Sequence, residues 1–397
     1  MSAHSQTIHI PPPERLVPGR YALTPIFLAL AIIGIIVSCF DAAANRVQFA
    51  YSWFFAFYYF FTIALGSFFW VVLHYACDSN WTVLVRRVWE NIIGLFLLFA
   101  VLFLPLLWPG TPDILWKYMS PQVQISLNHA KDWLNSTAFY SRAFFYFIYF
   151  ILAGHYYRRS SVEQDIDGNP VLSRRMHDWS YPALVIFGVF VTGIGCDWLM
   201  GLDWRWYSSL FGVYNFAVCA QAGMAAGIVL VAIFRSAGFL NGVNHEHYYL
   251  MGKLLFAFTI FWAYIAFGQF LLIWYGNIPE EAIFYNDHNR GHWVFLSYLL
   301  IAGKFMFPAI YLLAQDTKKS LRALTRIAVW ILVMHGVELY WFIMPYAHPN
   351  IGPKWQDLVS FVTVGSILGY AYIRLTASAS LIPTRDPRIV DCLTITN

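Results

Sequence analysis

Three ionisable residues in the last third of the chain, Lys304, His335 and Glu338, lie inside long apolar stretches. His335 and Glu338 are three residues apart, so their side chains share one face of a helix. A charge at membrane depth is costly and marks a candidate functional site. The three side chains can also relay protons, because each changes its charge on gaining or losing one. The pattern predicts either a structural ion pair or a protonatable relay, in which we expect Glu338 to carry the proton.

Further polar residues near the ends of apolar stretches form two candidate halves of a proton path. His74, Glu90 and His155 would make up one half, and Asp197 and Asp203 the other. Snorkelling toward the membrane interface and helix capping explain the same residues without a path. Both interpretations stay open from the sequence. Three amides are predicted to form hydrogen bonds between helices, namely Asn215, Gln221 and Gln269.

The composition indicates which elements must position these residues. Of the 397 residues, 59% are hydrophobic, 19% are aromatic and 12% are charged, whereas an ordinary soluble domain carries about 25% charged residues. A soluble surface with so few charges would expose large apolar patches, so a soluble globular protein is excluded. The net charge of +4 is small, and no basic stripe interleaved with aromatic residues is present, which argues against a nucleic acid as partner.

Windows of about 20 mostly apolar residues, the length that crosses a bilayer, predict an all-α polytopic membrane protein with about ten transmembrane helices. They form a single transmembrane domain over 23–377, between tails at 1–22 and 378–397. The second span contains the run Trp53–Phe61, which is aromatic on every face and predicts a helix packed against both lipid and protein. The predicted spans are 23–40, 51–76, 88–108, 140–157, 181–200, 208–234, 250–275, 293–314, 327–345 and 357–377.

Basic residues predict the orientation of these spans. An even number of spans places both termini on one side, and seventeen of the 25 Lys and Arg residues fall in the tails and loops of that side. Basic loops stay in the cytoplasm, so both termini are predicted to be cytoplasmic. Lys304 lies inside a span, and the remaining seven basic residues fall on the opposite side: Arg46, Lys117, Lys131, Arg142, Arg205, Arg290 and Lys354.

The sequence predicts no metal and no cofactor in this chain. A histidine-rich stretch at 244–247 offers adjacent ligands without a fourth partner, unlike a zinc site. A b-type haem between His74 and His155 is a weaker alternative, because a four-helix cytochrome usually binds two haems and no second matched pair exists. No two of the five cysteines have the spacing of a cluster or haem motif: Cys39, Cys77, Cys196, Cys219 and Cys392.

Two segments resemble a known family. The segment from Asp197 to Tyr214, DWLMGLDWRWYSSLFGVY, is similar to the DWxMSL…WxSTxFGxY signature of one membrane subunit of alternative complex III. Gly201 and Ser209 replace the usual Ser and Thr, and Trp204 replaces a common Pro. The segment 252–281 and the tail sequence RDPR at 385–388 resemble the same family. The chain thus resembles the ActF family, the smaller of two polysulfide-reductase-like (NrfD-like) subunits.

The resemblance implies a function in respiratory electron transport. Such a complex oxidises menaquinol or another quinol in the bacterial-type inner (cytoplasmic) membrane. The implied partners are the larger NrfD-like subunit, a multihaem cytochrome c subunit, an iron–sulfur subunit, other subunits and a haem–copper oxidase. Haem c and iron–sulfur clusters are expected in those partners and none in this chain. The implied fold is two four-helix bundles, about 51–200 and 208–345, with two peripheral helices, and the implied roles are scaffolding and proton conduction.

Two alternative functions stay open. The chain could bind quinol directly, with Asp197, Asp203 or His292 on the outer side as the proton acceptor. It could instead be a stand-alone secondary transporter, although the prolines fall mostly near span ends and give few of the broken spans typical of that class. As a subunit of a quinol:cytochrome c (or other acceptor) oxidoreductase complex, the chain is not expected to be catalytic alone.

Overall fold

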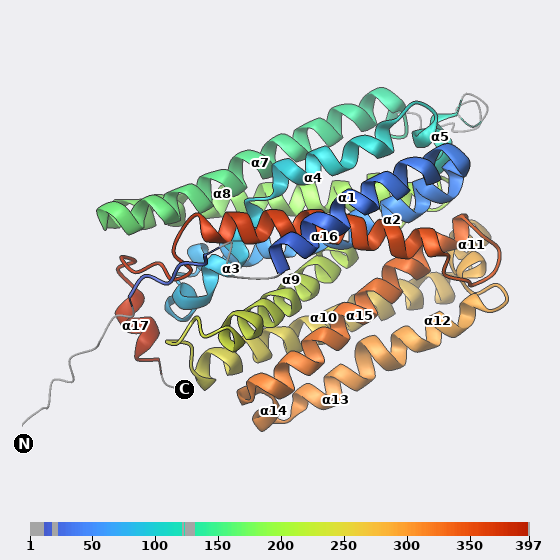
Figure 1. Ribbon diagram of the computed structural model, residues 1–397. Coiled ribbons are helices and arrows are strands. Elements are labelled where there is room, and N and C mark those ends of the chain that lie inside the picture. Colours follow the sequence, from blue (N-terminus) through green and yellow to red (C-terminus); the bar gives the residue numbers. More distant parts are fainter. Residues whose placement is uncertain (1–11, 18–22, 121–122, 124–131, 396–397) are drawn as a thin grey trace, which may run out of the picture.

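The computed structural model describes residues 12–17, 23–120, 123 and 132–395. The protein is 82% helical, and no strand occurs in these described ranges. Ten helices within them are long and apolar enough to cross a membrane. Figure 1 shows these helices running nearly parallel along one axis of the molecule. The predicted all-α polytopic fold is confirmed.

The first four-helix bundle is built from spans two to five. Helix α2 (Arg46–Ala76) packs against both α3 (Val83–Ile93) and α8 (Pro170–Ile194), and α7 (Ser136–Asp167) closes the ring by packing against α3 and α8. The third span continues from α3 into α4 (Phe96–Phe103), which also packs against α2 and α7. The short helix α5 (Thr111–Leu115) follows and covers one end of α2.

The second bundle repeats this arrangement with spans six to nine. Helix α9 (Phe211–Ser236) packs against α10 (His245–Gly276) and α15 (Leu321–Ile343). The eighth span closes the ring in three pieces, α12 (Trp293–Leu299), the π-helical segment η8 (Leu300–Met306) and α13 (Phe307–Leu313). Two short helices, α11 (Pro279–His288) and α14 (Gln315–Lys319), lie at opposite ends of this bundle.

Two helices lie outside the bundles. Helices α1 (Leu23–Ala44) and α16 (Trp355–Ala377) pack against each other, and α16 packs against α2. The described N-terminal segment and the C-terminal helix α17 (Ile389–Leu393) lie at the same end of the molecule (Figure 1). The Leu381 amide donates a hydrogen bond of 2.8 Å to the Glu14 carbonyl there. We call the end of the molecule that carries the N-terminal segment and α17 the tail end. The opposite end, which carries α5 and α11, is called the distal end.

Several helices are longer than the predicted spans. Helix α7 covers Ser136–Asp167 where 140–157 was predicted, and α10, α15 and α8 likewise begin earlier than predicted. Apolar windows find only the part of a helix that crosses the bilayer, whereas a capping side chain decides where the helix begins. Asparagine side chains cap four of the long helices by accepting backbone N–H groups: Asn45 for α2, Asn135 for α7, Asn169 for α8 and Asn244 for α10.

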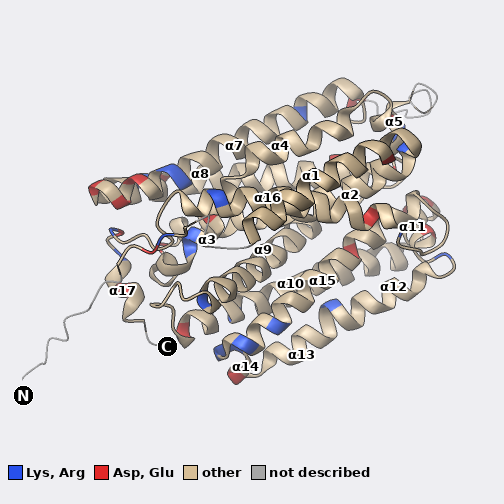
Figure 2. Ribbon diagram, viewed as in Figure 1, with Lys and Arg blue, Asp and Glu red and all other residues tan. Residues whose placement is uncertain are grey.

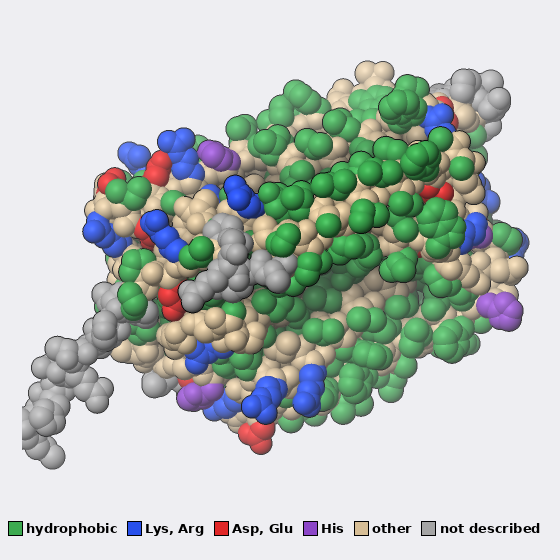
Figure 3. Space-filling model, in the orientation of Figure 1, with side chains coloured by type: hydrophobic (Ala, Val, Ile, Leu, Met, Phe, Trp, Pro, Cys, Tyr) green, Lys and Arg blue, Asp and Glu red, His purple; other side chains and the backbone are tan. Residues whose placement is uncertain are grey.

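The surface has the polarity expected of a membrane protein. In Figure 3 a broad band of hydrophobic side chains covers the middle of the visible face, and charged side chains gather toward its two ends. Figure 2 shows the same distribution on the ribbon. Helix α1 illustrates the band, since Ile32, Ile33 and Ile36 are each about half exposed. These features make the chain a multi-pass membrane protein.

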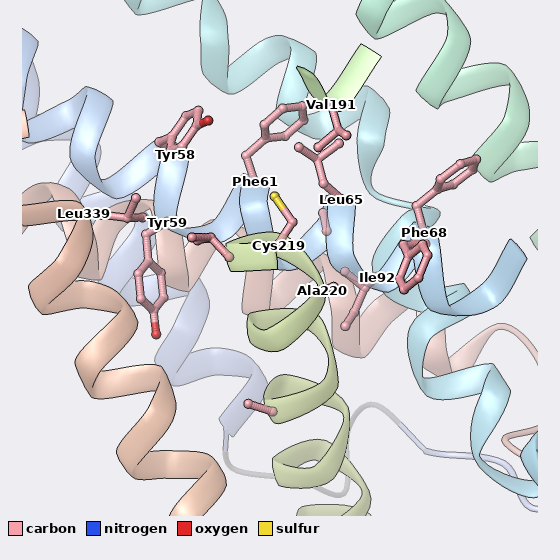
Figure 4. Close-up of a cluster of buried hydrophobic side chains, with 14 of the residues drawn as sticks. Tyr58, Tyr59, Phe61, Leu65, Phe68, Ile92, Val191, Cys219, Ala220 and Leu339 are labelled. Atoms are coloured by element: carbon pink, nitrogen blue, oxygen red, sulfur yellow. The ribbon is translucent and has the colours of Figure 1, made fainter. Parts of the chain in front are cut away.

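Helix α2 is the most enclosed of the spans because α9, α16 and the first bundle surround it. The aromatic run was predicted to pack against both lipid and protein. In the structure it packs against protein on nearly all of its faces. All of Trp53–Tyr59 and Phe61 are buried, and Phe60 is partly buried against Phe361 of α16. Figure 4 shows Cys219 of α9 beside Phe61 and Leu65 of α2.

Two glycines allow α2 and α9 to approach so closely. A Cβ atom on Gly66 would lie 1.8 Å from the Cys219 carbonyl oxygen, and one on Gly223 would lie 2.5 Å from the Gly66 carbonyl carbon. No side-chain rearrangement can relieve a clash with backbone atoms, so the helix axes themselves would have to separate.

We expect Gly66→Ala to destabilise the protein by at least the 1–3 kcal/mol typical of overpacking. Gly188→Ala is the matched control, since nothing lies within 4 Å of its added Cβ and alanine favours the helix by up to about 1 kcal/mol. The melting temperatures of the two purified variants are measured by thermal unfolding, with size-exclusion chromatography as the readout of the folded fraction. Equal melting temperatures for the two variants would contradict the close α2–α9 contact.

Candidate functional site

A buried ion pair lies in the middle of the second bundle. The Lys304 ammonium of η8 donates to the Glu338 carboxylate of α15, and neither side chain is exposed. The predicted pairing of these two residues across adjacent spans is confirmed. Because an unpaired charge in an apolar interior is very costly, the two groups can stay ionised there only together.

The carboxylate of Glu338 also accepts hydrogen bonds from the other two helices of the bundle. The Tyr214 hydroxyl of α9 and the Trp262 indole N–H of α10, the latter at 2.7 Å, both donate to Oε1. The Lys304 ammonium lies 4.9 Å from the centre of the Trp262 ring, a cation–π distance. All four helices of the second bundle thus converge on one carboxylate.

His335 connects this carboxylate to the first bundle. Its Nδ1 lies 3.7 Å from Glu338 Oε2, which is beyond hydrogen-bond distance, and has no hydrogen-bond partner among the described residues. Its Nε2 lies 2.9 Å from the Thr62 hydroxyl of α2, and the Tyr59 ring packs on the imidazole with centroids 4.9 Å apart. The predicted cluster of Lys304, His335 and Glu338 therefore forms in space.

A second buried charge lies in the first bundle. The Asp197 carboxylate receives two hydrogen bonds from the Arg142 guanidinium, at 2.7 and 2.8 Å, and one of 2.9 Å from the Tyr146 hydroxyl. The Arg142 guanidinium also stacks over the Trp133 ring, 4.1 Å from its centre. Arg142 and Tyr146 line a cavity of about 780 Å³ beside this pair.

Both buried charges lie on π-helical turns. Asp197 belongs to the segment Gly195–Leu199, and Lys304 belongs to η8. A π turn contains one extra residue, so it redirects the side chains that follow it, and such turns are frequent at functional sites. Each turn interrupts a regular membrane helix at the position where an ion must face the bundle interior.

Asp203 does not join Asp197. It binds Arg205 through two hydrogen bonds of 2.8 Å, and Arg205 binds Asp287 of α11 at 2.8 Å. The hydrogen bonds with Asp203, together with both carboxylate charges, raise the pKa of Arg205 above its ordinary value against the effect of its partial burial. Asp203 therefore ties the linker between the bundles to the distal end of the second bundle.

The three tail-end candidates are also separated. His74 is buried among the rings of Trp70, Trp81 and Trp89, and its Nε2 has no hydrogen-bond partner within the described ranges. Glu90 binds other groups, which are Arg86 at 2.8 Å, Arg87 at 3.0 Å and the Tyr75 hydroxyl at 3.2 Å.

His155 is exposed on α7. The structure therefore does not place it in one site with the enclosed His74, as a haem between the two would require. Among the described residues, no group of three or more His, Cys, Asp or Glu could hold a metal ion. In the stretch 244–247, Asn244 and His247 instead form a reciprocal capping box at the start of α10.

The C-terminal segment completes the tail-end charge cluster. Asp386 is buried between Arg86, at 2.8 Å, and Arg388, at 3.3 Å. Burial raises the pKa of Asp386, but the two guanidinium groups outweigh it and hold the pKa at about 2, below the usual 3.8. The RDPR sequence thus folds back onto α3 and fastens the C-terminal segment to the first bundle.

Several side chains that contact the buried charges are not among the residues predicted from the sequence. Arg142 lies just inside a predicted span but counts among the basic residues of the distal side there, although an arginine inside a span indicates a buried partner. Tyr146, Tyr214, Trp262 and Thr62 gave no signal, because aromatic and hydroxyl residues are common throughout these spans. Their side chains became identifiable only where the helices meet.

The predicted amide contacts are confirmed for two residues. Asn215 accepts from the Tyr58 hydroxyl at 2.8 Å and donates to the Val191 carbonyl at 2.9 Å, which joins α9 to α2 and α8. Gln221 donates to Thr259 of α10 at 3.0 Å. Gln269 instead accepts from Ser208 in the linker before α9.

Comparison with models of known protein families and with curated protein sequences finds no significant match for this chain. The resemblance to the alternative complex III subunit therefore rests on the quoted segments alone. The structure places the ends of the first segment at the two buried charges, since Asp197 binds Arg142 and Tyr214 binds Glu338.

Removing one member of the buried pair should cost more than removing both. We expect Lys304→Met to destabilise the protein by about 3–5 kcal/mol, because it leaves Glu338 as an uncompensated buried charge. The double variant Lys304→Met/Glu338→Gln should recover most of this loss, since Gln still accepts from Tyr214 and Trp262. Thermal unfolding in detergent is measured for Lys304→Met, Glu338→Gln and the double variant. If the effects of the two single substitutions add up to that of the double variant, the pair is not coupled.

The tail-end cluster should make the protein sensitive to acid. Asp386 has its pKa lowered from 3.8 to about 2, so its contribution is complete above pH 4 and is lost as the pH falls from about 4 to 2. The shift corresponds to about 2 kcal/mol. Melting temperature against pH should fall less steeply in Asp386→Asn than in the parent over that interval. Identical slopes would contradict this role.

Proposed function

We propose that this protein is a cofactor-free integral membrane subunit of a respiratory quinol-oxidising complex of the alternative complex III type. In that complex it would act as a scaffold and contribute a proton-conducting element centred on Glu338. The observation that carries the proposal is the fully buried Lys304–Glu338 pair, which lies beside a histidine whose Nδ1 is unpartnered among the described residues. If the cluster served stability alone, a hydrogen bond to that buried nitrogen would make it more stable.

The cluster can move a proton without creating a new net charge. Transfer of a proton from the Lys304 ammonium to the Glu338 carboxylate gives an amine and a carboxylic acid, both neutral. The bilayer interior favours this neutral form far more than water does. Tyr214 and Trp262 donate to Oε1 of Glu338, whereas Lys304 and His335 approach Oε2, so a proton could enter and leave the carboxylate by different neighbours.

A pair of polar groups between the two buried charges supports such a connection. Tyr58 and Asn215 are hydrogen-bonded to each other, and Asn215 also donates to the Val191 carbonyl, which joins α2, α9 and α8. Asp197 would serve the distal end of this route. His74 and Glu90 would serve the tail end, with His74 the better placed of the two because its Nε2 bonds to no described residue.

The same proposal assigns the protein to the bacterial cytoplasmic membrane with the tail end in the cytoplasm. The excess of basic residues in the tails and tail-side loops supports this orientation. The proposed partners are the larger NrfD-like subunit, a multihaem cytochrome c and an iron–sulfur protein. These partners would supply the redox centres, and menaquinol or another quinol would be the substrate of the whole complex.

The test is Glu338→Gln in the complex purified through a tag on this chain. We expect haem c and iron–sulfur proteins to co-purify with both parent and variant, and quinol oxidation to continue. In proteoliposomes, quinol-driven proton release per electron should fall by at least half in the variant, because Gln still accepts from Tyr214 and Trp262 but takes no proton. Lys304 can lose its own proton there, which leaves no unpaired charge in the interior.

Glu163→Gln is the matched control, since Glu163 forms only an exposed pair with Arg159, and it should behave as the parent. Glu338→Asp should restore part of the proton release. Normal proton release in Glu338→Gln would make this residue structural. A chain that purifies alone or as a homo-oligomer would contradict the assignment to the complex and favour a secondary transporter.

A further inference from the structure

A second cavity, of about 640 Å³, opens on the side of the second bundle. Residues of α9, α10, α11, α12, η8 and α15 line it. Its volume lies within the range of small-molecule sites, about 300–1,000 Å³. The cavity is distinct from the Asp197 site, because none of its lining residues belongs to the first bundle.

The cavity faces the bilayer between α10 and α12. Helix α10 packs against η8 and α13 toward the tail end and against α11 at the distal end, and it packs less closely with α12. Three residues at the opening, Phe267, Tyr298 and Ile301, are each more than half exposed on the lipid-facing surface. A ligand would therefore enter sideways from the membrane, beneath α11.

The inner wall of the cavity is the site already described. Tyr214 and Trp262 line the cavity and also donate hydrogen bonds to Glu338. A molecule in the cavity would touch the two side chains that hold the buried carboxylate. Such a molecule would therefore be separated from the Glu338 carboxylate by a single side chain.

The lining is aromatic, with a few uncharged polar groups. Phe270, Phe284, Phe305, Trp341 and Phe342 present ring surfaces, which favour a flat ring by stacking. Asn289 accepts from the Ser297 hydroxyl at 2.6 Å through its carbonyl oxygen. No hydrogen bond within the described part of the chain uses the side-chain Nδ2 of Asn289, which can donate to a ligand.

We propose that this side cavity binds a planar, lipid-soluble ring compound of the quinone class, with its carbonyl oxygens toward Asn289 and its isoprenoid tail in the bilayer. A phospholipid fits less well, because no Lys or Arg lines the cavity to bind a phosphate. The location differs from the Asp197, Asp203 and His292 site that the sequence suggested for quinol. The proposal concerns binding only and does not require this chain to conduct protons.

The site can be tested with a photoreactive azido-naphthoquinone that carries a short isoprenoid tail. Illumination of the purified complex should label peptides of α10, α11 and α12 in this chain, and excess unlabelled quinone should remove the label. Ala266 lines the cavity, so Ala266→Trp should fill it and lower the labelling of these peptides at least tenfold. Gly268→Trp is the matched control, since nothing lies within 4 Å of a Cβ there and Gly268 is not part of the lining.

A second variant on the opposite wall keeps the test decisive if Ala266→Trp does not assemble. Val294→Trp on α12 also fills the cavity and should give the same loss. Equal labelling of Ala266→Trp or Val294→Trp and the Gly268→Trp control would overturn the proposal. Label confined to another subunit, or displaced by phospholipid but not by quinone, would overturn it as well. Because the readout is labelling, its failure is distinguishable from normal proton release in Glu338→Gln.

Discussion

The cost of burying a charge in a membrane protein shapes the second bundle. Glu338 has no access to solvent, so Lys304, Tyr214 and Trp262 must replace the water that the carboxylate would otherwise bind. These donors come from three different helices, and each helix must hold a fixed rotation and depth to reach the same carboxylate. The ion pair thus acts as a geometric constraint on the bundle. The position of Lys304, one of its two members, depends on a π-helical turn.

Helix α2 of the first bundle contacts the residues around the ion pair in the second bundle. Gly66 and Gly223 let α2 and α9 approach to backbone contact, and Thr62 and Tyr59 of α2 then reach His335 beside Glu338. The aromatic side chains on the other faces of α2 fill the first bundle and the contact with α16. Close helix approach at small residues is the usual way in which membrane helices gain packing energy, since lipid gives them little hydrophobic drive to associate.

The side cavity and the buried pair share Tyr214 and Trp262, so the proposed ligand site and the proposed proton carrier contact the same two side chains. A ligand that stacks on these rings would alter the donors to Glu338, and protonation of Glu338 would weaken the hydrogen bond that it accepts from the Tyr214 hydroxyl. Reciprocity between two such sites follows from thermodynamic linkage. If both proposals hold, binding of the quinone-class ligand and proton transfer at Glu338 are coupled within one bundle.

Much of the fold could be predicted from the sequence, for a definite reason. Apolar length and the distribution of Lys and Arg depend only on the bilayer, so they indicate ten spans and a common side for the tails before any packing is known. The Lys304–Glu338 pair was predictable as well, since both residues lie at similar depth in neighbouring antiparallel spans. The lengths of the helices were not, because caps such as Asn135 lie outside the apolar windows.

The sequence by itself determined that this is a ten-span membrane protein with a short set of buried charges. Only the tertiary structure decided which charges meet. It joined Asp197 to Arg142, kept His155 on the surface, enclosed His74 among three tryptophans and opened a cavity beside Tyr214. Hydropathy is a property of each segment alone, whereas the partner of a buried polar group depends on the rotation and spacing of several helices, which packing sets.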